Sequence, residues 1–191
     1  MIKKIFIFLL LFLFSSILHA EIVKKIIIDG NNRVSEETII VYGEIETNKN
    51  YSEADLNKIL KNLYSTEFFE NVNVSLNGTN LNILVKEYPV INQLIFIGEK
   101  KKGYEEEIKK LIKLKEKKSF IKAYLLKDIE IIKKLYSSLG YNFAKVESRI
   151  RQVDEKNVDL LIEIDRGEKT KVSSISFIGN NRIRAKRLLD V

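Results

Sequence analysis

The residue types that most often carry out catalysis are nearly missing from this chain. Its 191 residues include no Cys and a single His, His19. The lack of Cys excludes disulfides, thiolate metal sites and cysteine nucleophiles. His19 lies in a segment that we expect to be removed, so Ser-His-Asp triads and histidine bases are excluded from the mature protein as well.

Two short motifs look like parts of active sites, and neither is complete. The stretch from Gly98 to Gly103 looks like a phosphate-binding loop, but Tyr104 and Glu105 stand where such a loop needs Lys and Ser or Thr. The acidic run 105–107 holds consecutive residues, which point in different directions on a helix. No nucleophile, base and orienting group can be combined from the sequence. We therefore expect that the protein is not an enzyme and needs no cofactor or metal.

The N-terminus has the features of an export signal. Lys3 and Lys4 precede an apolar run from Ile5 to Phe14, and the small residue Ala20 follows. This run is shorter than the ~20 residues that span a bilayer. We expect a signal peptide over residues 1–20, cut between Ala20 and Glu21, with an uncleaved membrane anchor as the alternative. In both cases the rest of the chain lies beyond the inner membrane.

The positive charge of the chain does not indicate a nucleic-acid-binding protein. The formal net charge is +7, from 33 Lys and Arg against 26 Asp and Glu. Lys and Glu are interspersed over residues 105–118, which is typical of a solvated helix face rather than a basic stripe. An exported protein also rarely meets nucleic acid. We expect no nucleic-acid partner.

The residues after the signal repeat one pattern. The sequence Gly-Asn-Asn-Arg occurs at Gly30 and again at Gly179, and a similar apolar strand ends at Gly98. A second marker, Leu-Tyr-Ser, occurs at residues 63–65 and 135–137. The repeats predict a first unit over residues 21–89, a second over 90–168, and the truncated start of a third over 169–191.

Each unit is predicted to read strand, helix, helix, strand, strand. In the first unit, Ser35 stands at an N-cap position, and Ser52 forms a capping box with Asp55. Apolar and polar residues alternate over 71–76, and Asn77-Gly78 turns the chain into a returning strand. This order predicts an α+β fold in which a three-stranded sheet carries two helices on one face.

The second unit is predicted to follow the same order. Glu105 to Glu107 form the first turn of a helix, and a long apolar stripe over 121–139 is closed by Gly140. The alternation in its hairpin points Ala144, Val146 and Ile150 inward, and Asp159, Glu163 and Asp165 outward. Tyr64, Tyr136 and Tyr141 are expected to pack between helix and sheet, with a ligand platform as the alternative.

A three-stranded sheet with helices on one face leaves one edge in water. An exposed edge presents unpaired backbone N–H and C=O groups, to which an extended peptide adds as a further strand. Backbone bonds give such binding an affinity that depends little on sequence. The edge is therefore the candidate functional site.

Three features of the sequence resemble POTRA (polypeptide-transport-associated) domains. They are the strand that ends in Gly-Asn-Asn-Arg, the Leu-Tyr pair followed by an aromatic residue and Val, and the junction over 85–91 that contains Pro89. In order and spacing they cover nearly all of the chain after the signal. The second unit departs from the pattern, because Glu99 follows its glycine where the other units have Asn.

The resemblance implies a periplasmic POTRA array followed by a C-terminal β-barrel, as in outer-membrane protein assembly factors. The implied partners are unfolded outer-membrane proteins, periplasmic chaperones, lipoproteins of the assembly complex and the outer membrane itself. The implied location is the periplasmic face of that membrane. The second strand of each unit, around 69–76 and 141–150, is the implied peptide-binding edge. Its candidate residues are Phe69, Val72, Val74, Tyr141, Phe143, Lys145, Val146 and Arg149.

Two other readings of the resemblance stay open. A translocation-and-assembly paralogue or a two-partner secretion transporter would share the fold and differ in partners. A cell-division scaffold would carry one POTRA domain behind a membrane anchor. The sequence beyond Val191 would distinguish the first of these, and retention of Met1 in the exported protein would favour the second.

Overall fold

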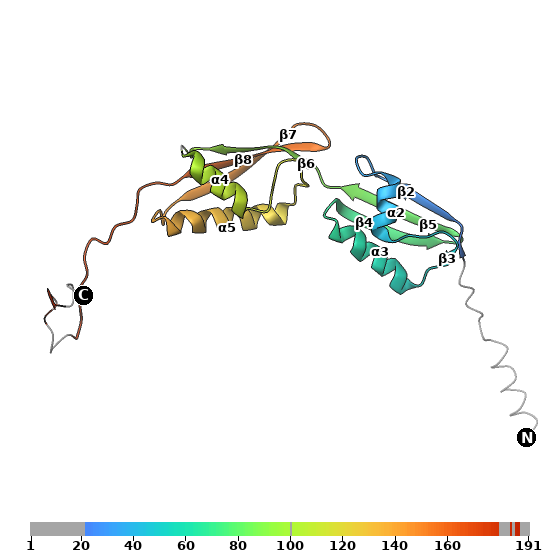
Figure 1. The fold of residues 1–191 in the computed structure, drawn as a ribbon, viewed down its shortest axis with the longest axis horizontal. Helices are drawn as coiled ribbons and strands as arrows, with labels where there is room; N and C mark the ends of the chain where they lie inside the picture. Colours follow the sequence, from blue (N-terminus) through green and yellow to red (C-terminus); the bar gives the residue numbers. More distant parts are fainter. Residues whose placement is uncertain (1–21, 100, 180–183, 185, 188–191) are drawn as a thin grey trace, which may run out of the picture. The chain divides into compact units, whose positions relative to one another are not determined.

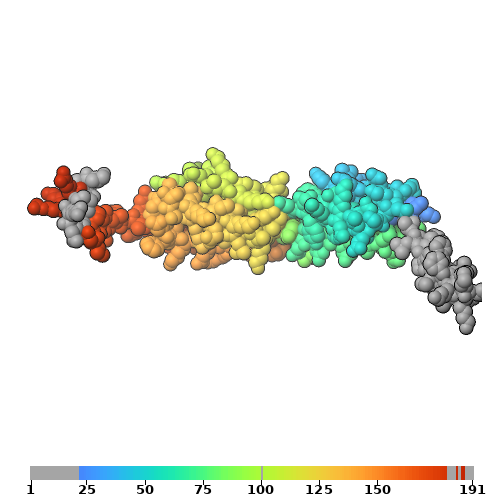
Figure 2. All heavy atoms as spheres, turned by 90° about the horizontal axis from the view of Figure 1, so that it is seen from below, coloured from blue at the N-terminus to red at the C-terminus, as the bar shows by residue number. Residues whose placement is uncertain are grey.

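The computed structural model describes residues 22–99, 101–179, 184, 186 and 187. The predicted signal peptide and its cleavage site at Ala20 and Glu21 lie outside the described residues. The chain divides between Tyr88 and Pro89 into two compact units, each with its own core. Figure 2 shows their atoms, blue to green for the first unit and yellow-green to orange for the second.

The first unit has the expected order of elements. Two helices cover one face of a three-stranded sheet, whose strand order is β2-β5-β4 (Figure 1). Strand β2 runs parallel to β5, and β4 pairs with β5 as an antiparallel hairpin. The elements are β1 (Ile22–Val23), β2 (Lys25–Asp29), α2 (Glu36–Gly43), β3 (Lys49–Asn50), α3 (Glu53–Ser65), β4 (Phe69–Asn77) and β5 (Asn80–Glu87).

The second unit repeats this architecture, so the predicted α+β fold is confirmed. Its sheet has the order β6-β8-β7, with β6 parallel to β8 and β7 antiparallel to it. The elements are β6 (Val90–Ile97), α4 (Lys102–Leu111), α5 (Lys122–Ser138), β7 (Lys145–Gln152) and β8 (Asn157–Asp165). None of the described helices is long and apolar enough to cross a membrane.

Local signals in the sequence set the helix ends. The Ser35 hydroxyl accepts the N–H of Thr38, and Ser52 and Asp55 form a reciprocal capping box. Helix α5 ends at Ser138, and Gly140, whose φ is +90°, closes it as predicted. The next residue, Tyr141, donates its N–H to the carbonyl of Tyr136, which satisfies a carbonyl that the helix end leaves unpaired.

Helix α4 begins earlier than predicted. It starts at Lys102, so Glu105 alone of the three glutamates lies in the first turn, and Gly103 is helical. The earlier start places Tyr104 on the helix, where it packs against the core of the unit and meets the ring of Tyr136 edge-on at 6.3 Å. Packing of this aromatic residue outweighs the poor helix propensity of glycine.

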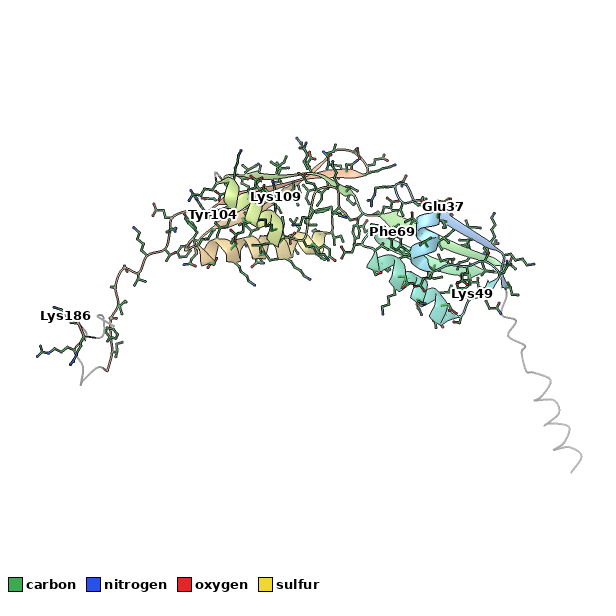
Figure 3. All side chains as sticks on the ribbon, viewed as in Figure 1. Glu37, Lys49, Phe69, Tyr104, Lys109 and Lys186 are labelled. Atoms are coloured by element: carbon green, nitrogen blue, oxygen red, sulfur yellow. The ribbon has the colours of Figure 1, made fainter. Side chains whose placement is uncertain are left out.

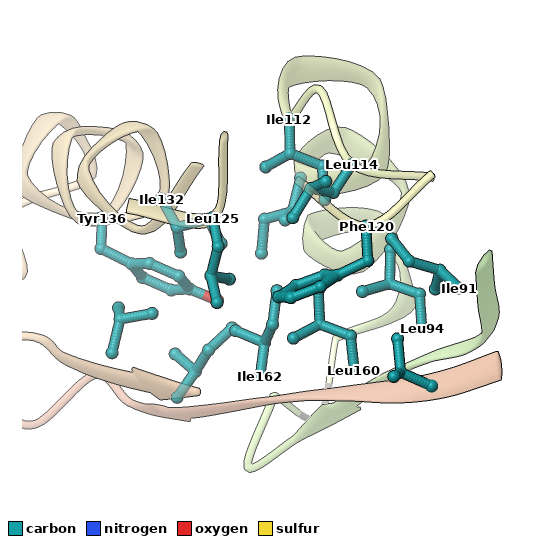
Figure 4. Close-up of a cluster of buried hydrophobic side chains, with 14 residues drawn as sticks. Ile91, Leu94, Ile112, Leu114, Phe120, Leu125, Ile132, Tyr136, Leu160 and Ile162 are labelled. Atoms are coloured by element: carbon teal, nitrogen blue, oxygen red, sulfur yellow. The ribbon is translucent and has the colours of Figure 1, made fainter. Parts of the chain in front are cut away.

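The helices and the sheet of each unit enclose an apolar core. In the second unit, Tyr136 and Ile132 reach down from α5 and meet Leu160 and Ile162 of the sheet (Figure 4). In the first unit, Phe69 stands at the start of β4 (Figure 3). This residue is 1% exposed. The other first-unit core residues on the sheet are Ile28, Val72, Leu81, Ile83 and Val85.

Two residues of the second hairpin point the way that the sequence predicts but differ from the expected burial. Ile150 was expected in the core, yet it is 46% exposed because β7 is an edge strand. Asp159 was expected in water, yet it is 1% exposed. Asp159 stands on the face away from the helices, but Asn92 and Arg151 cover its carboxylate and donate hydrogen bonds to it.

The predicted opening strand of a third unit is not formed. Residues 166–177 have neither helix nor strand, and residues 180–183 of its Gly-Asn-Asn-Arg motif lie outside the described part of the chain. In both complete units the opening strand pairs with the last strand of the same unit. Among the described residues, no strand follows β8 that could serve as such a partner.

Candidate functional site

Each sheet has two edges, and the edge formed by the opening strand is partly covered. In the first unit, β1 leads directly into β2 and pairs with β3, which lies between the two helices. In the second unit, the segment between α4 and α5 runs along β6. Lys117 donates its N–H to the carbonyl of Ile91 at 2.7 Å, and Ile91 donates its own to Lys118 at 2.9 Å. These contacts leave β4 and β7 as the candidate sites for a further strand.

The register of the second hairpin shows which backbone groups of β7 face outward. Val153 donates its N–H to the carbonyl of Asn157 at 3.0 Å, and the pairing continues without a shift to Lys145 opposite Asp165. Hydrogen-bonded and non-bonded pairs alternate in an antiparallel ladder. Odd-numbered residues of β7 therefore bond to β8. The residues whose N–H and C=O groups face the outer edge are Val146, Ser148, Ile150 and Gln152.

The predicted site residues of the second unit take different positions along this edge. Val146 directs its backbone outward, whereas Lys145 and Arg149 direct theirs to β8. Phe143 precedes the strand and is 79% exposed. Tyr141 packs against the core, edge-on to Tyr136 at 6.3 Å. The strand thus supplies the backbone groups, and its neighbours supply apolar surface.

The two arginines on the open face of this hairpin are paired with acids. Arg149 contacts Glu163 at 3.2 Å, and Arg151 contacts Asp159 at 2.5 Å. The hydrogen bond from Arg151 lowers the pKa of the Asp159 carboxyl from its usual value, and the bond from Asn92 adds to this effect. These arginines carry little uncompensated charge, so they offer little long-range attraction to an acidic peptide.

The edge of the first unit differs from that of the second. Asn77 and Asn80 close a two-residue turn in which Gly78 has a φ of +58°. By the same alternation, Val72, Val74 and Leu76 direct their backbone groups outward. The N–H of Val72 already has a partner, because it donates to the hydroxyl of Tyr64 at 3.1 Å. Part of this edge is therefore occupied from within the unit.

In each unit a carboxylate holds the loop after the opening strand. In the first unit this carboxylate belongs to the last strand, and in the second it belongs to the loop itself. Glu87, at the end of β5, accepts the N–H groups of Asn32, Arg33 and Val34 at 2.8–2.9 Å. Burial raises the pKa of Glu87, but these three donors outweigh burial, so the pKa lies below its usual value.

In the second unit, the carboxylate belongs to the loop itself. Glu99 follows Gly98 and accepts hydrogen bonds from Lys101 and from the Tyr136 hydroxyl. The cation is Arg166, at the end of the last strand and 4.0 Å from Glu99. The carboxylate and its cation have thus exchanged places relative to the first unit, where Arg33 of the loop contacts Glu87 of the last strand at 3.5 Å.

Sequence reasoning missed one buried carboxylate that organises the second unit. Asp128 on α5 is 1% exposed and accepts the N–H groups of Lys113 and Leu114, both at 2.8 Å. It holds the segment that leads from α4 toward the edge of β6. Its spacing from Leu125 and Ile132 places it on the apolar stripe of the helix, and this signal could have identified it.

The described part of the chain does not offer a metal site. In residues 22–99 and 101–179, His, Cys, Asp and Glu side chains do not gather in threes where they could hold a metal ion. A shallow hollow of about 350 Å³ lies on the open face of the first sheet. It is lined by Asn71, Asn73, Leu84, Val85 and Lys86.

Comparisons with known proteins agree with the architecture of two successive units. A family model for POTRA, described as a surface antigen variable number repeat, matches residues 21–88 and again 89–167. The outer membrane protein assembly factor BamA of Neorickettsia risticii is 29% identical over 171 residues, which cover 90% of this chain and 23% of that protein. BamA of Neisseria meningitidis serogroup B is 26% identical over 170 residues, with 87% and 21% covered.

Among solved structures, the N-terminal domain of Omp85 from Thermosynechococcus elongatus is similar at 18% identity and a TM-score of 0.49. The match covers 81% of this chain and 72% of that one. The chain spans less than a quarter of the length of the two BamA relatives. The family model covers most of the chain, and the strand order repeats within each matched segment. The chain therefore belongs to the POTRA family, and its two units are consecutive POTRA domains.

Proposed function

We propose that this chain is part of a periplasmic POTRA array that binds unfolded outer-membrane proteins and partner lipoproteins and so aids β-barrel insertion. The observation that carries the proposal is the outward-directed backbone of β7, at Val146, Ser148, Ile150 and Gln152. The setting is supported by the names of the BamA relatives, which are assembly factors for outer-membrane proteins. The proposed work is binding at the periplasmic face of the outer membrane, without catalysis.

Strand addition suits a receptor for many different clients. The backbone groups of a client are the same whatever its sequence, so hydrogen bonds along an edge give affinity with little sequence preference. The paired arginines on the open face of the hairpin strengthen this argument, since they leave little free charge to select acidic clients. We expect weak binding that changes little with salt.

The side chains around β7 favour clients with alternating apolar and polar residues. Ile150 stands on the helix side of the sheet and is 46% exposed, while Arg149 and Arg151 stand on the open side. A client strand beside β7 would place every second side chain near Ile150 and the others near the arginines. Strands of outer-membrane barrels alternate in this way, so they match both faces of the edge.

A proline substitution tests the proposal at one backbone position. Ser148 directs its N–H outward, so Ser148→Pro removes an edge donor while the ladder to β8 stays intact. We expect Ser148→Pro to weaken the binding of a barrel-strand peptide by about tenfold or more, because a donor is lost and the ring blocks the approach. The measurement is peptide anisotropy or NMR titration of the whole exported chain.

The matched control is Ser148→Ala, which keeps the N–H and should bind as the wild type does. Circular dichroism must first show that both variants are folded. Proline at Lys145 is unsuitable, because the Lys145 N–H faces β8 and its loss would break the hairpin. Unchanged affinity in a folded Ser148→Pro variant would refute strand addition at this edge.

A further inference from the structure

The two units carry the same Leu-Tyr-Ser marker, but their tyrosines occupy different environments. Tyr64 in the first unit is 45% exposed, whereas Tyr136 in the second is 0% exposed. Figure 4 shows the Tyr136 ring reaching from α5 toward the sheet. Its hydroxyl donates to Glu99 at 2.5 Å, so it is held inside the unit and away from the edge of β7.

Tyr64 lies instead at the edge of β4. Its hydroxyl accepts the N–H of Val72 at 3.1 Å, and Val72 directs that N–H away from β5. Val72 and Val146 occupy equivalent positions in the two units. Val72 pairs with Val85, whose carbonyl lies against Gly30. Val146 pairs with Ile164, whose carbonyl lies against Gly98. The same backbone donor is thus occupied in one unit and directed outward in the other.

Two local differences explain why the tyrosines diverge. The connection from α3 to β4 spans residues 66–68, whereas the connection from α5 to β7 spans residues 139–144. The shorter connection keeps the end of α3 close to the start of β4. In addition, Asn31 stands where the second unit has Glu99, and its amide donates to the carbonyl of Val34. The first unit therefore lacks at this position the carboxylate that holds Tyr136 inward.

We propose that Tyr64 closes the edge of β4, so that an extended client segment is added to β7 of the second unit and not to β4 of the first. The inference rests on the proposed function and assigns Tyr64 as the residue that selects between the two edges. Beyond Val72, β4 offers only Val74 and Leu76 before its turn. Strand β7 offers four outward residues, so a client forms a longer ladder there.

The occupant is an extended segment of an unfolded polypeptide with alternating apolar and polar side chains. The chemistry of β7 supports this choice, because exposed Ile150 lies on one side of the edge and the paired arginines lie on the other. Phe143, which is 79% exposed just before the strand, extends the apolar surface along the chain. A fully apolar segment would meet charged groups on the open side, and a fully polar one would leave Ile150 in contact with polar groups.

The test compares amide hydrogen exchange in both units of the whole exported chain, with and without a barrel-strand peptide. In the wild type, we expect the peptide to protect the amides of Val146, Ser148 and Ile150 and to leave those of Val74 and Leu76 unchanged. Tyr64→Phe frees the Val72 N–H, and Tyr64→Ala also removes the ring. In both variants, protection should appear along β4. Affinity for the first unit should rise about three- to tenfold, as the gain of one hydrogen bond gives.

The control is Tyr42→Phe, which removes the hydroxyl of another tyrosine of the first unit. Tyr42 is 53% exposed, and its variant should leave the amides of β4 unprotected by the peptide. Protection of β4 in the wild type, or no gain in Tyr64→Ala, overturns the role of Tyr64 while the proposed function stands. Protection at neither edge in the wild type overturns the proposed function and this inference together. Tyr64 is half exposed, so its variants should fold, and the amide spectrum of the core checks this.

Discussion

Removal of the Asp128 carboxylate should destabilise the second unit strongly. Asp128→Ala leaves the N–H groups of Lys113 and Leu114 without their acceptor, and Leu114 is 2% exposed. A hydrogen bond to a charged group contributes ~1.5–3 kcal/mol, and two such bonds are lost. After partial relaxation we expect a loss of about 3–5 kcal/mol, against the ~5–15 kcal/mol that a typical domain has in total.

Urea unfolding of the whole chain, followed by hydrogen exchange resolved to each unit, measures this loss. The slope for a small domain is ~1–3 kcal/mol/M, so the midpoint of the second unit should fall by about 1 M or more. The first unit should not change. Asp128→Asn keeps one oxygen acceptor and should lose about half as much free energy of unfolding.

The control on the same helix is Glu130→Ala, whose side chain is 61% exposed and pairs with Lys133 at 3.3 Å. Such an exposed pair contributes about 0–1 kcal/mol, so the midpoint should hardly move. A loss of less than about 1 kcal/mol in Asp128→Ala would refute the argument that this carboxylate organises the segment between α4 and α5.

Three further predictions concern the loops and the N-terminus. The three backbone donors hold the folded pKa of Glu87 below its ordinary value in an unfolded chain, so its stabilisation is present above that ordinary value and is lost as pH falls through the folded pKa. Melting of the first unit against pH should show this loss in the wild type but not in Glu87→Gln. Gly98→Ala places Cβ 2.2 Å from the carbonyl oxygen of Ile164 and should cost about 1–3 kcal/mol of folding free energy. Gly167→Ala, with a φ of +62° and no neighbour within 4 Å, should cost only about 1 kcal/mol by the same urea assay. Export should remove residues up to about Ala20, and the intact mass of periplasmic protein at the full 22.2 kDa would contradict this.

The features that were predictable from the sequence are those fixed by neighbouring residues. The Ser52–Asp55 capping box and the end of α5 at Gly140 depend on a few successive side chains and on backbone angles. The alternation along β4 and β5 gave the core face of the first sheet, because only one face is covered by helices. The order of elements followed from these local signals and from the repeat.

The features that were missed depend on contacts between distant segments. Asp159 is buried because Asn92, 67 residues away, donates to it across the sheet. Ile150 is exposed although it stands on the helix side of the sheet, because an edge strand has a neighbour on one side only. The different environments of Tyr64 and Tyr136 follow from the position of Glu99 and from loop length. The alternation of residues along a strand carries none of this information.

The sequence also could not predict which residues of β7 direct their backbone N–H and C=O groups outward, although this decides how a client would pair. It follows from the closing bond between Val153 and Asn157 and from an unbroken register to Lys145. A one-residue shift would exchange the roles of all residues in the strand. The hairpin loop, in which Asp154 accepts the N–H of Lys156, fixes that register.

Nuclear Overhauser contacts between a bound barrel-strand peptide and the whole chain test strand addition most directly. Strands in a sheet lie ~4.8 Å apart, so amides of the peptide should contact those of Ser148 and Ile150. The amides of Glu147 and Arg149 face β8 and should show no such contacts. Contacts confined to α4 and the segment after it, Ile108 to Lys118, with β7 unaffected, would contradict the account and place the client on the helical face.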